Sequence, residues 1–115
     1  MWPYDDEELA YLNLGKTDFI MDTKPEYIAM VKAGLKKAEV RSWKKPLEGQ
    51  YVKLRNTETK RFDCIILIDQ IWDLDKHFTE QEKEDILDEL FVTQDFRNNY
   101  DCRYLYTIKE VHNLH

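Results

Sequence analysis

The chain has 115 residues with three glycines and three prolines, and its 43% hydrophobic content is typical of one folded domain, which we place at residues 1–115. No apolar run approaches the roughly 20 residues that a membrane helix needs, and the first ten residues lack the basic and then apolar order of a secretory signal. The net charge of −6, taken alone, argues against a nucleic-acid partner.

The first predicted elements are a short acidic helix or turn at residues 5–14 and a strand at residues 18–23. A helix is expected next, over residues 24–33. Thr23 is its expected N-cap, with Glu26 completing a capping box, because a Ser or Thr followed three residues later by Glu marks a helix start.

Gly34 is placed to end this helix in the left-handed conformation. The period of the pattern then changes, since Ala38 and Val40 alternate with Glu39 and Arg41. This alternation predicts a strand with one face in water.

The second half of the chain is predicted to contain three strands and one helix. The strands are expected at residues 51–55, 61–72 and 102–112, and the middle one is apolar on both faces and therefore central. An acidic helix at residues 79–90 opens with a second capping box, TEQE. The order β-α-β-β-β-α-β, with two main helices, predicts an α+β fold whose sheet curls into a small β-barrel.

Charge is segregated along the chain. Residues 31–61 hold ten Lys or Arg and three Glu, a net +7, whereas the other 84 residues hold seven basic and twenty acidic residues, a net −13. One interpretation is a solvated face balanced by acidic neighbours. Trp43 and Tyr51 lie among the basic residues, and this interleaving favours a second interpretation, a basic groove where bases of single-stranded RNA stack on aromatic rings.

On a strand, Lys37, Glu39, Arg41 and Trp43 project in line from one face. Two purely structural interpretations also stay open: Glu39 and Arg41 form an ion pair that stabilises the fold, and Trp43 packs in the core. A cluster of neighbouring lysines is tolerated where the side chains are solvated, and such a cluster can bind an anion. The candidate ligand-binding residues are Lys36, Lys37, Glu39, Arg41, Trp43, Lys44, Tyr51, Lys53 and Arg55.

The eight residues "GLKKAEVR", at positions 34–41, carry the pattern G-x-K-x-x-E-x-R. In this pattern the chain resembles the ASCH domain family of the PUA-like superfamily. The resemblance covers about residues 16–112, because a strand and a helix lead into the motif and a glycine-containing turn follows it. It implies a β-barrel whose motif strand lines a cleft for RNA or a nucleotide. Some members of the family are amidohydrolases acting on N4-acetylcytidine, and others are ribonucleases.

In the amidohydrolase members, the motif lysine acts with a threonine three positions later and with a distal glutamate. Lys36 matches the lysine, and Glu82 is the candidate for the glutamate, with Glu80 and Glu84 as alternatives. Glu39 stands where the threonine should be, which argues against deacetylation and leaves binding untouched. If the chain is an enzyme, Lys36, Glu39 and Glu82 are its candidate catalytic residues, because a lysine beside a carboxylate can transfer protons.

No cofactor is expected. His112 and His115 supply too few ligands for a metal site. Cys64 and Cys102 lie far apart and outside any zinc spacing, and Cys64 belongs to an apolar run, so we expect reduced thiols and a cytoplasmic location. Three functions stay open: binding of RNA or a nucleotide, hydrolysis, and protein interaction through the acidic helix at residues 79–90. None involves a membrane.

Overall fold

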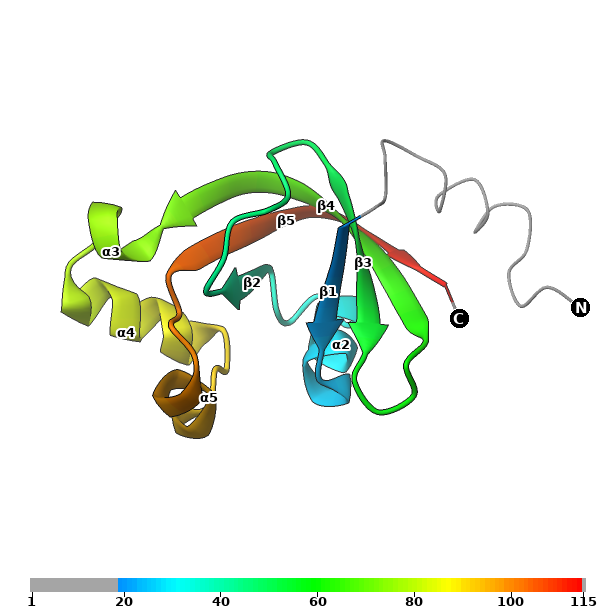
Figure 1. Ribbon diagram of the computed structural model, residues 1–115, viewed down its shortest axis with the longest axis horizontal. Coiled ribbons are helices and arrows are strands. Elements are labelled where there is room, and N and C mark those ends of the chain that lie inside the picture. Colours follow the sequence, from blue (N-terminus) through cyan, green and yellow to red (C-terminus); the bar gives the residue numbers. More distant parts are fainter. Residues whose placement is uncertain (1–18, 115) are drawn as a thin grey trace, which may run out of the picture.

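Five strands form one mixed sheet that curves as a half-barrel (Figure 1). The computed structural model describes residues 19–114, so the helix or turn expected at residues 5–14 lies outside the described residues. The strands are β1 (Phe19–Thr23), β2 (Ala38–Arg41), β3 (Tyr51–Asn56), β4 (Phe62–Asp73) and β5 (Tyr104–Asn113). Their order across the sheet is β1-β3-β4-β5-β2. β1 pairs with β3 in parallel and the other pairs are antiparallel, so the predicted α+β class and the central place of β4 are confirmed.

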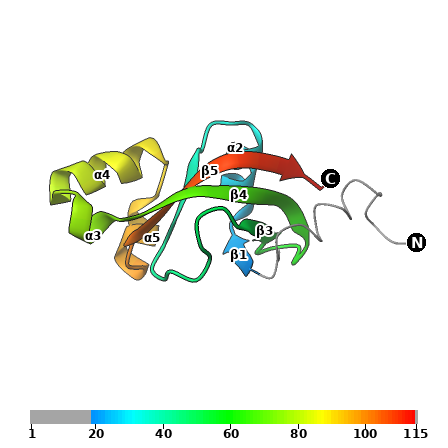
Figure 2. The ribbon, with the colours of Figure 1, turned by 90° about the horizontal axis from the view of Figure 1, so that it is seen from above.

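The helices fall into two groups. α2 (Pro25–Lys32) connects β1 to β2, whereas α3 (Leu74–His77), α4 (Glu80–Glu89) and α5 (Gln94–Asn99) gather beyond one end of β4 and β5 (Figure 2). α2 and α4 were predicted; α3 and α5 were not, because four and six residues are too short to show a helical period. None of the helices within residues 19–114 is long and apolar enough to cross a membrane.

The two predicted capping boxes have different outcomes. At α4 the box is confirmed, since Thr79 Oγ1 accepts from the Glu82 N–H at 3.1 Å and Glu82 Oε1 accepts from the Thr79 N–H at 2.9 Å. At α2 the prediction is wrong, because the N-cap is Lys24, with no side-chain hydrogen bond. Thr23 instead ends β1 with its side chain buried, and its hydroxyl donates to the Met21 carbonyl at 3.1 Å.

Two apolar clusters stabilise the fold. We call the first the sheet core; it consists of Met21, Ile28, Val31, Val52, Leu54, Cys64, Ile66, Ile68 and Tyr106. We call the second the helical core; it consists of Ala38, Val40, Leu74, Leu87, Val92, Cys102 and Leu105. β2 belongs to the curved sheet but contributes its apolar side chains to the helical core, so it lies where the two cores meet.

Candidate functional site

The segment that leads into the site is shaped by Gly34. Its φ is +75°, in the left-handed region, as the sequence predicted. The backbone N–H groups of Leu35 and Lys36 both donate to the Met30 carbonyl, at 2.9 and 3.2 Å, which closes the end of α2. The chain therefore turns sharply at Gly34 and enters β2 with Lys36 directed inward, 3% exposed.

β2 is buried on both faces, so the prediction of one wet face is wrong. Ala38 and Val40 pack in the helical core, and Glu39 on the opposite face is only 1% exposed. Tyr27 of α2 and Phe96 of α5 line a small cavity together with Glu39, so they cover this face. The covering residues come from distant parts of the chain, which alternation within β2 cannot reveal.

Arg41 is held by its neighbours. Its Nη1 donates to Glu39 Oε2 at 2.9 Å and to the Val40 carbonyl at 2.8 Å. Its Nη2 donates to the Asp22 carbonyl at 3.2 Å and to Thr23 Oγ1 at 3.0 Å. Four of its five N–H groups are thus used within the protein, which confirms a structural Glu–Arg pair, and no described residue accepts from its Nε–H.

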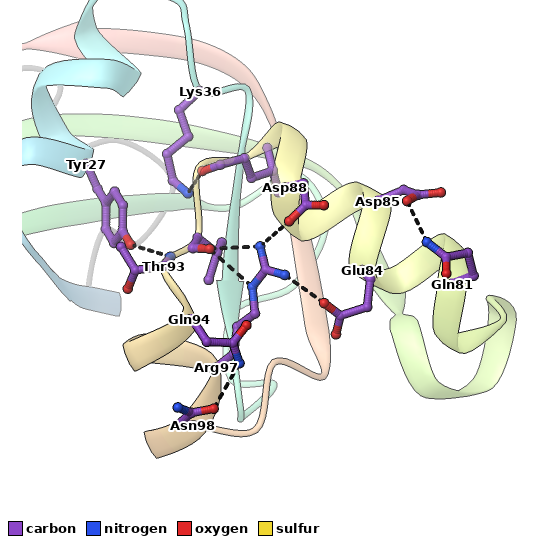
Figure 3. A network of polar contacts seen from close by, with 12 residues as sticks. Tyr27, Lys36, Gln81, Glu84, Asp85, Asp88, Thr93, Gln94, Arg97 and Asn98 are labelled. Carbon is purple, nitrogen blue, oxygen red and sulfur yellow. Dashed lines mark hydrogen bonds and ion pairs between the residues drawn. The ribbon is translucent and has the colours of Figure 1, made fainter.

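Lys36 joins the α2–β2 segment to the end of α4. Its Nζ donates to the Leu90 carbonyl at 3.0 Å and lies 4.6 Å from the centre of the Tyr27 ring, and the Tyr27 hydroxyl accepts from the Thr93 N–H at 3.3 Å (Figure 3). Burial lowers the pKa of Lys36 below its ordinary value, while the nearby Glu39 carboxylate acts in the opposite direction.

A cleft of about 460 Å³ opens beside Arg41. Its aromatic lining consists of Tyr27, Trp43, Phe96 and Tyr100, and its cationic lining of Lys24, Arg41 and Lys45. Asp22 is the one carboxylate among the described lining residues. Arg55 donates to both oxygens of Asp22, at 2.6 and 3.1 Å, and this hydrogen bonding lowers the pKa of the carboxyl group. The cleft therefore presents an excess of positive charge in an acidic protein.

The small cavity that Glu39 lines has a volume of about 10 Å³, and its lining also includes Lys36 and Val92. The cavity and the cleft share Tyr27, Arg41 and Phe96 as lining residues, so the two lie next to each other. Glu39 Oε1 is buried and has no hydrogen-bond partner among residues 19–114. Glu39 thus lines a space of about the size of one water molecule, and one of its two carboxylate oxygens has no donor among the described residues.

The structure brings together four of the predicted ligand-binding residues. Arg41 and Trp43 line the cleft, and Lys36 and Glu39 line the adjacent cavity. Trp43 also fulfils the alternative interpretation, because it packs against Tyr106, whose hydroxyl donates to the Trp43 carbonyl at 2.6 Å.

The other predicted residues lie elsewhere. Lys37 and Lys44 are exposed and belong to the lining of neither space. Tyr51 packs near His112, and Lys53 lies over the Phe62 ring. Arg55 forms an ion pair with Asp22 but does not itself line the cleft. Glu82, the third candidate catalytic residue, caps α4 in solvent, and the hydrogen bonds with Thr79 lower its pKa.

Sequence reasoning missed Tyr27, Phe96 and Tyr100, which supply most of the aromatic lining. Phe96 and Tyr100 stand four residues apart, and their rings pack with centroids 4.7 Å apart. This i, i+4 spacing in "FRNNY" was the available signal for a helix with an aromatic face. Tyr27 gave no such signal, because an aromatic residue in a helix is usually part of a core.

The curved sheet and its cleft define a small α+β domain of the PUA-like type. The ASCH domain model matches residues 21–115, and the chain belongs to this family. Crystal structures of an ASCH protein from Zymomonas mobilis have a similar fold: one has a TM-score of 0.59 at 15% identity and covers 82% of this chain and 67% of that chain. A point variant of that protein gives a TM-score of 0.61 at 15% identity, covering 82% and 68%. No curated protein matches this sequence.

Proposed function

We propose that the chain binds a nucleotide, free or within single-stranded RNA, in the cleft. The observation that carries the proposal is the combination of aromatic and cationic side chains around a space of about 460 Å³. Ligand sites of about 300–1,000 Å³ are typical for small molecules, and one nucleotide fits such a volume.

The aromatic lining suits a planar base. The Trp43 ring packs against the Tyr106 ring, and Tyr100 is 57% exposed with its ring tilted by 32° against that of Phe96. A base that stacks on an aromatic side chain gains about 1–3 kcal/mol in such sites. Because every base has a flat face, these rings favour nucleotides in general.

The cations suit a phosphate. Arg41 has most of its N–H groups committed, so Lys24 and Lys45 are the lining cations best able to meet an anion. Lys45 Nζ lies over the Trp43 ring, 5.5 Å from its centre, which places positive charge on one face of that ring. A phosphate held by lysines gives binding that weakens as salt concentration rises.

The test is titration of a fluorescently labelled single-stranded RNA and of nucleoside monophosphates at two salt concentrations. Lys45→Glu and Tyr100→Ala should each weaken binding about tenfold, because one removes a phosphate contact and the other a stacking face. Lys44→Glu is the matched control, since Lys44 has the same charge, is the adjacent residue and lies outside the cleft lining. Absence of binding, or equal losses for Lys44→Glu and Lys45→Glu, would contradict the proposal.

Hydrolysis is a second candidate because Lys36 and Glu39 line the same cavity and burial lowers the pKa of Lys36. Lys36 is however bonded to the Leu90 carbonyl, and Glu82 caps α4. We therefore expect little or no release of acetate from N4-acetylcytidine. Turnover by the wild-type protein that is lost in Lys36→Ala would favour the enzyme instead.

The third function, a protein partner on the acidic helix, stays a prediction. Part of the acidic surface of this helix is used within the protein, because Glu84 and Asp88 form ion pairs with Arg97 at 2.7 and 2.8 Å (Figure 3).

A further inference from the structure

The two oxygens of Glu39 have different surroundings. Oε2 accepts from Arg41 Nη1 at 2.9 Å, which fixes the orientation of the carboxylate. Oε1 is buried, and no described residue donates to it. A buried acceptor without a donor is destabilising, so the site is suited to a group that brings an N–H.

The size of the cavity limits what can reach Glu39 Oε1. About 10 Å³ admits one heavy atom, such as a water oxygen or a single substituent of a ring. The N–H group within a uracil ring is flanked by two carbonyl oxygens, and this edge does not fit a space for one atom. An exocyclic amino group projects from its ring as one nitrogen with two hydrogens and does fit.

We propose that Glu39 Oε1 accepts a hydrogen bond from the exocyclic amino group of a base bound in the cleft. The site then selects amino-bearing bases, such as cytosine and adenine, over bases with a carbonyl at the same position, such as uracil and hypoxanthine. This inference rests on the proposed function, since it names the chemical class of base that the cleft prefers.

Lys36 lines the same cavity and could donate to a carbonyl, so its role must be weighed against that of Glu39. Lys36 Nζ already donates to the Leu90 carbonyl and lies over the Tyr27 ring, whereas Glu39 Oε1 has no donor among the described residues. A carbonyl oxygen in the cavity would leave Glu39 unsatisfied and bring two acceptors together. Sites built to pair with a polar group strongly reject analogues that lack it, which makes the amino group the better occupant.

The experiment measures, by calorimetry, the affinities of the wild-type protein for CMP and UMP, and for AMP and IMP. Each pair differs by an amino group in place of a carbonyl and by the hydrogen on the adjacent ring nitrogen, while the ribose, the phosphate and the size of the ring system are the same. We expect the amino member of each pair to bind about 5- to 100-fold more tightly.

Glu39→Gln tests the residue directly. The carboxamide oxygen can still accept from Arg41, which turns its NH₂ group toward the cavity and replaces an acceptor by a donor. The preference should then fall to near one or reverse in favour of UMP and IMP. Glu48→Gln, at an exposed glutamate outside both linings, is the control and should keep the wild-type preference.

The results separate this inference from the proposed function. Binding of all four nucleotides without preference would show that water alone occupies the cavity, which overturns the inference and leaves nucleotide binding intact. Binding of none of them would overturn both. The wild-type comparison decides the matter even if Glu39→Gln fails to fold, which its melting temperature would reveal.

Discussion

The sheet core and the helical unit at α3–α5 are stabilised in different ways. The sheet core is apolar, and its members are at most 2% exposed. The helical unit contains a smaller apolar cluster and depends more on polar contacts: Arg97 alone donates to Glu84, Asp88 and the Val92 carbonyl. The difference matters because both regions contribute residues to the cleft. We expect the residues that belong to the sheet side to be held more rigidly than Phe96 and Tyr100 of the helical unit.

Besides the packing of β2 and β5 in the helical core, a few contacts around Tyr27 and Lys36 join the two regions. Lys36 donates to the Leu90 carbonyl, Tyr27 accepts from the Thr93 N–H, and the rings of Tyr27 and Phe96 pack edge to face with centroids 6.5 Å apart. These contacts position the Phe96 and Tyr100 side of the cleft. We therefore expect changes in the helical unit to alter ligand binding before they unfold the sheet.

The largest expected effect comes from the buried leucines Leu54 and Leu87, one in each core and at most 1% exposed. Leu54→Ala and Leu87→Ala should each destabilise by about 2–5 kcal/mol through lost burial and the resulting cavity. Leu54→Ala should lower global stability in urea unfolding. Leu87→Ala should increase amide exchange mainly at residues 80–99, and equal increases in the strands would contradict the distinction between the two regions.

A smaller effect is expected from Arg97, whose side chain is 11% exposed while its partners Glu84 and Asp88 are 52% and 69% exposed. Ion pairs with exposed partners contribute little to stability. The main effect of Arg97→Met is therefore that the carbonyl of the buried residue Val92 loses its hydrogen-bond donor, which should lower the free energy of unfolding by about 1–2 kcal/mol. Arg103→Met is the control, because the Arg103 side chain is 46% exposed and its ion pair with Asp73 should contribute less to stability. Thermal unfolding of both variants measures the difference, and a larger loss for Arg103→Met would contradict this account.

The sheet region was largely predictable from the sequence, and the helical unit was not. Alternation in β3 and the apolar run in β4 reflect burial by neighbouring strands, a local pattern that the sequence records. α5 has no fully buried residue, so it lacks the apolar period by which helices are recognised. Its position depends on Arg97, a charged residue whose partners lie 5 to 13 positions away.

The candidate site was predictable only in part. The motif identified Lys36, Glu39 and Arg41, and the structure places all three at the cleft or its adjacent cavity. It did not indicate that Glu39 is buried, since the covering side chains of Tyr27 and Phe96 lie 12 and 57 positions away in the sequence. The predicted ligand-binding residues included Lys44 and Lys53 but missed Lys45, because composition cannot tell which lysine of a cluster faces a cleft.

The smallest expected difference in stability is between substitutions at the two glycines with positive φ, Gly34 at +75° and Gly49 at +80°. An added Cβ at either position meets no atom within 4 Å, so Gly34→Ala and Gly49→Ala should each cost only the left-handed backbone strain, about 1–2 kcal/mol.

The effects of the two glycine substitutions on ligand binding should differ. Just after Gly34, the N–H groups of Leu35 and Lys36 both donate to the Met30 carbonyl. If the backbone at residue 34 relaxes to relieve the strain of the added Cβ, Lys36 shifts and the lining of the cavity changes. Gly49 lies in the β2–β3 connection, outside the lining of both spaces. Urea unfolding should therefore give similar losses for the two variants, whereas CMP affinity should fall several-fold in Gly34→Ala alone. An equal fall in Gly49→Ala would mean that the loss reflects general destabilisation, and the link between the turn at Gly34 and the site would be lost.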